Sequence, residues 1–325
     1  MFSTPTDGIA SVKAAAERVA ESVRRSVVGQ DAAAETLLAA YIAGGHALIE
    51  GVPGIAKTLL ARAFASSLGL KFTRAQFTPD LMPSDLLGAN VFDQSATAFR
   101  LVRGPVFTEV LMADEINRTP PKTQSALLEC MQERQVTIDG VSHELPQVFF
   151  VIATQNPVEF EGTYPLPEAQ LDRFLVRVDM GLPERAAEIE IYRRAVAGTL
   201  AGWGADQALP APVVTRAEAS ALRLASRLVH VAPELLDYVA SLASAVRESP
   251  RVEIPVSPRG ALALIETARS TALISGRDFV APDDVKRCLA PCWAHRVLLT
   301  ADAELENETP AGVLGRIASA VPVPR

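Results

Sequence analysis

The stretch over residues 46–60, which reads HALIEGVPGIAKTLL, constrains the fold of this chain more than any other. Its apolar run at 47–49 is typical of a buried strand, the Gly/Pro segment after it is typical of a loop, and the apolar pattern from Thr58 onward is typical of a helix. The segment is nearly G-x-x-x-x-G-K-[ST], in which backbone N–H groups, a helix N-terminus, a lysine and a hydroxyl hold phosphate and Mg²⁺. This order of elements predicts a phosphate-binding loop.

Four residues of the stretch supply the parts that such a loop needs: Gly51, Gly54, Lys57 and Thr58. Ala56 departs from the pattern, because a glycine is usual there. An alanine is sterically allowed if the residue already sits in the helical region, but the loop then lacks one flexible point. The alternative interpretation is a Gly/Pro turn that happens to precede a lysine.

A second apolar run, residues 110–113, ends in the acidic pair Asp114 and Glu115. In a chain that already has a phosphate loop, we expect Asp114 to hold Mg²⁺ through its water shell and Glu115 to orient and deprotonate the attacking water. The alternative is an acidic pair that caps the next helix. It is disfavoured because Thr119 and Pro120-Pro121 already offer that helix a cap and a first-turn proline.

A third buried strand is predicted at residues 148–153, and Asn156 follows its end. Ligands of open α/β sheets lie at the carboxyl ends of strands, so the ends at Ile49, Ala113 and Ala153 should face one nucleotide. Asn156 would then hold the attacking water or the terminal phosphate. The alternative is a simple Asn-Pro turn.

The remaining elements of the first half follow from hydrophobic periodicity and turn residues. Asp31 is a predicted N-cap, and Asp139-Gly140 is typical of a two-residue hairpin turn. We expect helices over residues 11–27, 31–43, 58–67, 121–133 and 168–174, strands over 71–77 and 175–179, and hairpins over 90–107 and 136–145.

A break at 181–183 marks a predicted domain boundary, which gives domains of 1–182 and 183–325. Beyond it, alternating Leu/Ala and Arg/Glu predict an all-α bundle. Its helices are expected at residues 184–197, 216–228, 233–249, 259–275 and 282–295, with a short one from Pro310.

Size and charge limit the class of protein. With 325 residues and 49% apolar residues, the chain can bury a large core and suits two domains. It has 31 basic and 38 acidic residues, a net charge of −7, which disfavours a nonspecific DNA-coating role without excluding a local basic patch. No stretch has the pattern of a signal peptide or a membrane span, so we expect a cytoplasmic protein without a membrane partner.

The cysteines and histidines carry no predicted chemistry. Cys130, Cys288 and Cys292 cannot close a disulfide framework, and packing on helix faces is favoured over a metal site. His143 is expected on a solvated strand, and no function is assigned to the helix-end residues His230 and His295.

From about Val28 to its end, the chain resembles the MoxR-type AAA+ ATPases. The motifs that carry the resemblance are GVPGIAKT, LMADEINRTPPKTQSALLECMQE, ATQNPVEFEGTYPLPEAQLDRF, SPRGALAL and FVAPDDV. The resemblance implies an α/β P-loop core with strand order 5-1-4-3-2, a helical lid, and a hexameric ring of identical subunits with ATP at their junctions. The alanine at position 56 belongs to this family's usual loop.

The same resemblance assigns roles to individual residues. Lys57 and Thr58 would bind phosphate and Mg²⁺, Asp114 and Glu115 would be the acidic pair, and Asn156 would be the first sensor. Arg173 would be a finger that enters the neighbour's site, and Arg259 the lid sensor, although each reads by itself as a solvated charge. Residues 28–30 would lie by the adenine. The implied ATP-binding set is Gly29, Gln30, Gly51, Val52, Pro53, Gly54, Ile55, Ala56, Lys57, Thr58, Leu59 and Arg259.

The predicted function is an ATP-driven remodelling chaperone with ATP and Mg²⁺ as cofactors. Relatives of this type often act beside proteins with a von Willebrand A domain or help metal cofactors enter target enzymes. Two alternatives stay open: a DNA-acting AAA+ motor, which the acidic balance disfavours, and a nucleotide-gated scaffold with little turnover, which Glu115 argues against.

Overall fold

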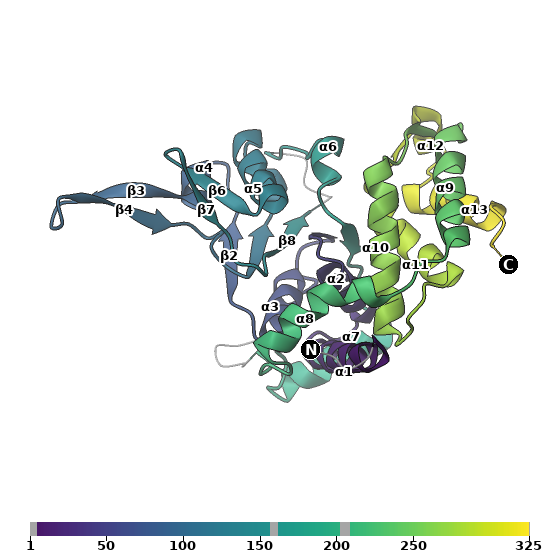
Figure 1. Cartoon of the computed structure of the whole chain (residues 1–325), viewed down its shortest axis with the longest axis horizontal. Coiled ribbons are helices and arrows are strands. Elements are labelled where there is room, and N and C mark those ends of the chain that lie inside the picture. Colours follow the sequence, from purple (N-terminus) through teal and green to yellow (C-terminus); the bar gives the residue numbers. More distant parts are fainter. Residues whose placement is uncertain (1–4, 157–161, 202–208, 325) are drawn as a thin grey trace.

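The structure is a computed structural model that describes residues 5–156, 162–201 and 209–324. Figure 1 shows an α/β core joined to a group of helices at the C-terminal end of the chain, with a long hairpin extending from the far side of the core. The predicted α/β core with a helical lid is confirmed.

A five-stranded parallel sheet forms the centre of the core. Its order is β2-β5-β8-β1-β9, which, numbered along the core, is the predicted 5-1-4-3-2 read from the other edge. The strands are β1 (Ala47–Glu50), β2 (Phe72–Gln76), β5 (Val110–Asp114), β8 (Phe150–Gln155) and β9 (Val176–Asp179).

Helices cover both faces of this sheet, because successive strand residues point to opposite sides. Ala47 and Ile49 of β1 belong to a buried cluster that includes α1 (Pro5–Ser26), α2 (Asp31–Ile42) and α3 (Lys57–Ser67). Leu48 belongs to a second cluster, with α5 (Pro121–Glu133). The continuous apolar runs of the sequence thus reflect a sheet buried on both sides.

Two hairpins leave the core as predicted. One joins β3 (Gly88–Asp93) to β4 (Ala98–Arg103), and the other joins β6 (Gln135–Ile138) to β7 (Val141–Glu144). The turn of the second has positive φ at both Asp139 (49°) and Gly140 (79°), the conformation for which Asp-Gly is suited. Figure 1 shows the first hairpin reaching far beyond the other elements.

The helices follow the predicted ranges with a few differences. The N-cap of α2 is Gln30, so the prediction of Asp31 as its cap is wrong; Asp31 is the first helical residue and accepts a 2.7 Å hydrogen bond from Arg24. The other helices and helical turns before the predicted boundary are α4 (Pro83–Leu87), η1 (Ile116–Arg118) and α6 (Glu168–Leu171), and α7 (Arg185–Val196) follows just after it. The element α6 is shorter than predicted.

The C-terminal part is helical and also holds elements that were not predicted, namely the antiparallel pair β10 (Val252–Ile254) and β11 (Leu298–Leu299) and the short α12 (Ala301–Leu305). The two strands are too short to show a periodicity of their own. Its other elements are α8 (Arg216–Ala225), η2 (Ser226–Leu228), α9 (Pro233–Glu248), α10 (Pro258–Ile274), α11 (Pro282–Trp293) and α13 (Pro310–Ala320).

One buried cluster runs across the predicted boundary at 182/183. It contains residues of α1 and α2 together with residues of α8, α10 and α11, and α1 and α2 both pack against α8 and α10. Because these helices share one core, the domain boundary at 182/183 stays a prediction. None of the described helices is both long enough and apolar enough to cross a membrane.

Candidate nucleotide site

The loop between β1 and α3 has the close approaches that a phosphate cradle needs. A Cβ placed on Gly51 would lie 2.2 Å from Cδ1 of Ile55 and 2.6 Å from the carbonyl oxygen of Met180, so no larger residue fits there. Gly54 has a φ of +85°, which glycine adopts without strain. Val52 and Pro53 are exposed at the tip of the loop.

Ala56 precedes the first residue of α3 with φ 69° and ψ 27°, in the left-handed region. The condition set from the sequence, a residue already in the helical region, is therefore not met. A non-glycine residue in this conformation costs about 1–2 kcal/mol. The loop thus carries local strain at the residue where the consensus has glycine.

Lys57 begins α3 and reaches back over the loop. Its Nζ donates to the carbonyl oxygen of Gly51 at 2.6 Å and to that of Gln155 at 3.4 Å. The ammonium thus lies between the end of β1 and the end of β8, where it can meet the outer phosphates of a nucleotide. Thr58, the next residue, is partly exposed beside it.

Asp114 is buried at the end of β5 and is held on both oxygens. Its Oδ1 accepts a 2.5 Å hydrogen bond from Oγ1 of Thr154, and its Oδ2 lies 2.6 Å from Nη2 of Arg74. Arg74 lies on β2, the neighbouring strand, with its side chain half exposed. The carboxylate is therefore fixed in place and has a cation against its outer oxygen.

Glu115 follows directly in the left-handed conformation, with φ 58° and ψ 50°. Its backbone N–H donates to Oγ1 of Thr154 at 2.9 Å, and its Oε2 accepts from Nε2 of Gln76 at 2.6 Å. Arg118 lies 3.3 Å from the same oxygen.

The predicted Thr119 cap of α5 is absent, because Pro120 is the N-cap residue and the Thr119 hydroxyl donates to the carbonyl oxygen of Thr78. The acidic pair does not cap α5 either: Glu115 is the N-cap residue of η1, and its side chain makes no capping hydrogen bond there.

The ends of β5, β8 and β1 lie side by side, because these strands are neighbours in the sheet and Ala153 is in register with both Ala113 and Leu48. Asn156 comes directly after β8 and is buried. The carboxyl edge of the sheet thus brings Lys57 and the acidic pair together with Asn156, as expected for one ligand.

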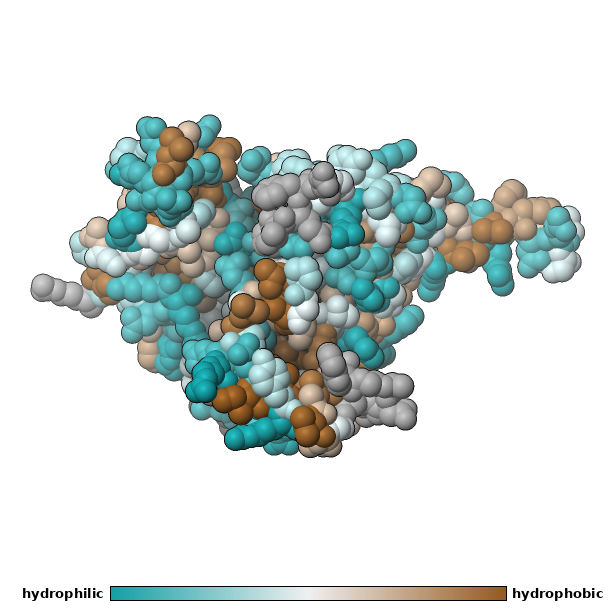
Figure 2. All heavy atoms as spheres, turned by 180° about the vertical axis from the view of Figure 1, so that it is seen from behind, coloured by the Kyte–Doolittle hydropathy of each residue, from teal (hydrophilic) through white to brown (hydrophobic). Residues whose placement is uncertain are grey.

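A cavity of about 430 Å³ opens beside the loop, the size of a small-molecule site. Figure 2 shows apolar surface in the hollow near the lower centre of the face seen from behind. Gly29 does not line the cavity, and packs instead against the start of α7, where a Cβ would lie 2.8 Å from Ala187. The lining includes the predicted residues Val28, Gln30, Gly54, Ile55, Ala56 and Leu59, with Leu182 and Pro183 opposite.

The two predicted arginines lie elsewhere. Arg173 precedes β9 and Arg259 is in the first turn of α10, and both line a different cavity, of about 330 Å³, beside Gly45 and His46 at the start of β1. Because the sheet is parallel, this is the amino edge, opposite to the edge that holds Lys57. The structure therefore brings the two arginines together with each other but not with the loop of their own chain.

Comparison with known proteins decides the family. A model described as the ATPase family associated with various cellular activities (AAA) matches residues 46–176, and an AAA lid domain model matches 244–317. The chain is 42% identical over 329 residues to Chaperone MoxR1 of Mycobacterium tuberculosis, covering 98% of this chain and 85% of that protein. The chain belongs to the MoxR family of AAA ATPases.

Two further comparisons agree with this membership. Protein MoxR of Methylorubrum extorquens is 33% identical over 88% of both chains. The crystal structure of a protein described as an ATPase from Cytophaga hutchinsonii matches with a TM-score of 0.88 at 36% identity, over 98% of both chains. As a MoxR-family protein, the chain has the AAA fold with its lid and the nucleotide binding and ATPase activity general to that family.

The loop and the acidic pair fit a magnesium nucleotide. Thr58 and Asp114 offer the oxygen ligands that Mg²⁺ prefers. No group of three or more His, Cys, Asp or Glu suited to a metal occurs among the described residues.

Sequence reasoning missed three residues of this site: Arg74, Gln76 and Thr154. Arg74 and Gln76 are alternate residues on β2, so both point to one face, and they pair with Met112 and Asp114 in the ladder to β5. Two polar residues at this spacing in a strand next to the acidic pair are the signal that could have found them.

Proposed function

We propose that this MoxR-family ATPase hydrolyses ATP with Mg²⁺ at the junctions of a ring of identical subunits and uses the cycle to remodel partner proteins. The observation that carries the proposal is that the nucleotide-loop residues and the two arginines lie at opposite edges of the sheet. Lys57 and the acidic pair lie at the carboxyl edge of the sheet, whereas Arg173 and Arg259 line a cavity at its amino edge. One copy therefore offers its arginines to a neighbour.

Within one chain, the residues prepare the nucleotide and the water. Lys57 pairs with the outer phosphates, and Thr58 and Asp114 would hold Mg²⁺, which supplies charge compensation when bound. Glu115 accepts the proton of the attacking water, and the hydrogen bond from Gln76 fixes the direction of its carboxylate. Asn156 holds that water from the end of β8.

Arg173 completes the neighbour's site. As the bond to the leaving oxygen breaks, its electron pair passes to that oxygen, and the charge of the transferred group is spread over its three other oxygens. A guanidinium placed there stabilises this transition state more than it stabilises the bound ATP. Arg259 lines the same cavity, so it should act on that same neighbour and not on the nucleotide of its own chain.

A protein client fits the surface better than nucleic acid does. The β3–β4 hairpin exposes Val91, Phe92, Phe99 and Val102, and the rings of Phe92 and Phe99 stack edge to face with centroids 5.4 Å apart. Figure 2 shows the apolar residues of this hairpin at the far end of the molecule. Such a surface suits apolar polypeptide segments, including those of a protein with a von Willebrand A domain, and the net charge of −7 disfavours a phosphate backbone.

Subunit mixing tests the proposal directly. Arg173→Ala should bind ATP normally yet lose most turnover, and Lys57→Ala should lose ATP binding. Mixed in equal amounts, the two should regain activity, since roughly a quarter of the junctions in a random ring pair an intact loop with an intact finger. Gel filtration with ATP must first show that both variants assemble.

Arg118→Ala provides the matched control, because Arg118 lies 3.3 Å from Glu115 of its own chain. An arginine that acts within its own chain cannot be rescued by Lys57→Ala subunits, since every site in the mixture then carries a defect. Absence of rescue for Arg173→Ala in assembled, exchanging rings would exclude the junction mechanism. Saturable DNA binding that stimulates turnover would favour the DNA-acting alternative instead.

A further inference from the structure

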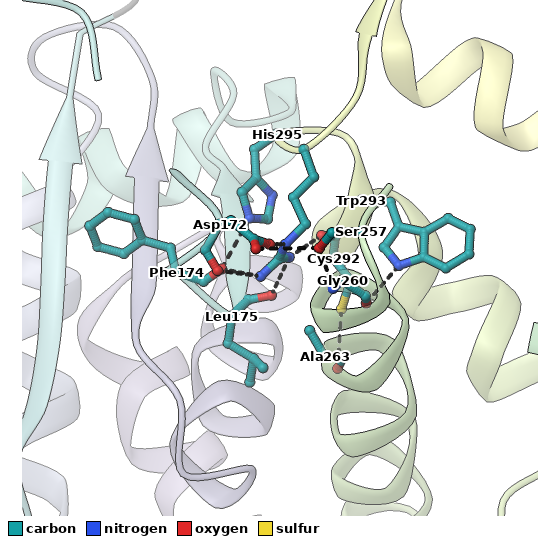
Figure 3. A network of polar contacts seen from close by, with 10 residues as sticks. Asp172, Phe174, Leu175, Ser257, Gly260, Ala263, Cys292, Trp293 and His295 are labelled. Carbon is teal, nitrogen blue, oxygen red and sulfur yellow. Dashed lines mark hydrogen bonds and ion pairs between the residues drawn. The ribbon is translucent and has the colours of Figure 1, made fainter. Parts of the chain in front are cut away.

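The buried side chain of Arg296 in the lid is hydrogen-bonded to the segment that carries Arg173. Arg296 follows α11, and its side chain is only 4% exposed. Its guanidinium donates to the segment around Asp172 to Leu175 and to Cys292 of the lid, and Figure 3 shows these partner residues lying close to one another. A buried arginine of this kind needs a full set of partners, because an uncompensated charge there is costly.

The guanidinium uses all five of its N–H groups. Nε donates to Oδ1 of Asp172 at 2.6 Å, and Nη2 donates to the backbone oxygens of Asp172 at 3.2 Å and Phe174 at 2.6 Å. Nη1 donates to the oxygen of Leu175 at 3.1 Å and to that of Cys292 in α11. Four of the five bonds thus fasten the residues on either side of Arg173 to the lid, two at Asp172 and one each at Phe174 and Leu175.

Asp172, a partner of Arg296, also connects to the segment that carries Arg259. Its Oδ2 accepts a 3.3 Å hydrogen bond from Oγ of Ser257. The Ser257 Oγ in turn caps α10 by accepting a hydrogen bond from the N–H of Gly260 at 3.1 Å. Ser257 lies two residues before Arg259, and Asp172 lies one residue before Arg173. A single carboxylate therefore joins the backbone segments that carry both arginines.

The first turn of α10 also fits closely around Arg296. A Cβ placed on Gly260 would lie 3.0 Å from Cδ of Arg296 and 2.4 Å from Cγ2 of Val256. The indole Nε1 of Trp293 donates to the oxygen of Gly260 at 2.8 Å (Figure 3). The turn that holds Arg259 thus cannot shift without disturbing Arg296.

We propose that Arg296 and Asp172 are positioning residues that hold Arg173 and Arg259 as one unit for the nucleotide of the neighbouring subunit. The inference rests on the proposed function, since it gives the two arginines a shared target. In this role, Arg296 and Asp172 would contact neither the nucleotide nor the attacking water. The pair fixes the distance between the finger, which belongs to the core, and the sensor, which belongs to the lid.

Arg296→Lys is the variant to test, because lysine keeps the charge but offers three donors at one point instead of five in a planar fork. We expect turnover to fall by about 10- to 100-fold, because small displacements of catalytic groups carry losses of that order. ATP affinity should stay within about twofold of wild type, because the chain's own loop is at the opposite edge of the sheet. The activity should return when these subunits are mixed with Lys57→Ala subunits, which supply intact fingers.

Arg277→Lys is the matched control. Arg277 makes a two-point ion pair with the buried carboxylate of Asp284, and both lie within the lid, away from the Arg173 segment. A general loss of lid stability would affect both lysine variants alike in thermal unfolding. Only Arg296→Lys should lower kcat.

Asp172→Asn serves as the second variant if Arg296→Lys does not fold, since the amide keeps the shape and can still meet Ser257. The same loss of kcat, with rescue by Lys57→Ala, is expected. Folded variants with wild-type kcat, weakened ATP binding, or a loss that is not rescued while Arg173→Ala is rescued would each overturn the positioning role. If Arg173→Ala itself is not rescued, the proposed junction mechanism fails first, and the inference fails with it.

Discussion

Thr154→Val removes one hydroxyl and leaves the shape of the side chain unchanged. That hydroxyl is fully buried, donates to Oδ1 of Asp114 at 2.5 Å and accepts the N–H of Glu115 at 2.9 Å. A hydrogen bond to a charged group contributes about 1.5–3 kcal/mol, and a neutral one about 0.5–1.5 kcal/mol. The variant should therefore lose about 2–4.5 kcal/mol of unfolding free energy.

The same change should slow hydrolysis, because the backbone N–H of Glu115, a residue in the left-handed conformation, loses the hydroxyl that accepts its hydrogen bond. The carboxylate of Asp114 loses the donor that holds its Oδ1. We expect kcat to fall at least about tenfold, which corresponds to about 1.4 kcal/mol in the barrier. Urea unfolding gives the stability, and single-turnover hydrolysis with saturating ATP gives the rate of the chemical step.

Two variants frame this result. Thr154→Ser keeps the hydroxyl and should retain most of the activity. Thr267→Val removes a buried hydroxyl of α10, which donates to the carbonyl oxygen of Ala263 at 2.8 Å, and should leave turnover unchanged. A Thr154→Val protein with wild-type stability and rate would show that the hydroxyl does not organise the acidic pair.

Three further changes address the loop and its chemistry. Lys57→Ala should weaken ATP binding by several kcal/mol, because charge-assisted bonds to the triphosphate are lost; unchanged affinity in calorimetry would refute the assignment. Glu115→Gln should bind ATP but hydrolyse it slowly, because the amide cannot take a proton; a wild-type single-turnover rate would place the base elsewhere. Ala56→Gly should relieve about 1–2 kcal/mol of strain while adding about 0.4–1 kcal/mol of unfolded-state entropy, so the urea midpoint should rise slightly or stay, and a clear fall would contradict the strain.

The local sequence pattern was enough to predict those residues of the candidate site that directly follow a strand. The glycines, Lys57 and the acidic pair each follow from a strand end and the residues just after it. Arg74 and Gln76 could not be found in this way, because their role depends on the register of β2 against β5, which only the folded sheet defines. Thr154 was taken as a residue after a strand, whereas β8 includes it.

The positions of Arg173 and Arg259 show the same limit. Motifs pointed to both residues, but their common place at the amino edge of the sheet depends on how the lid packs, which spacing along the chain does not show. Likewise β10 and β11 pair across more than forty residues of sequence and are too short to stand out by periodicity. Long-range packing, not local preference, decides these features.

The buried cluster that joins α1 and α2 to α8, α10 and α11 has a consequence for movement. A close-packed core has discrete arrangements and does not deform continuously, so the lid cannot swing on the sheet without repacking these helices. We therefore expect each subunit to move largely as a rigid body during the ATP cycle. Under the junction mechanism proposed above, force would pass through changes in the angle between neighbouring copies, with the proposed contact between Arg173 and the neighbour's nucleotide as the pivot.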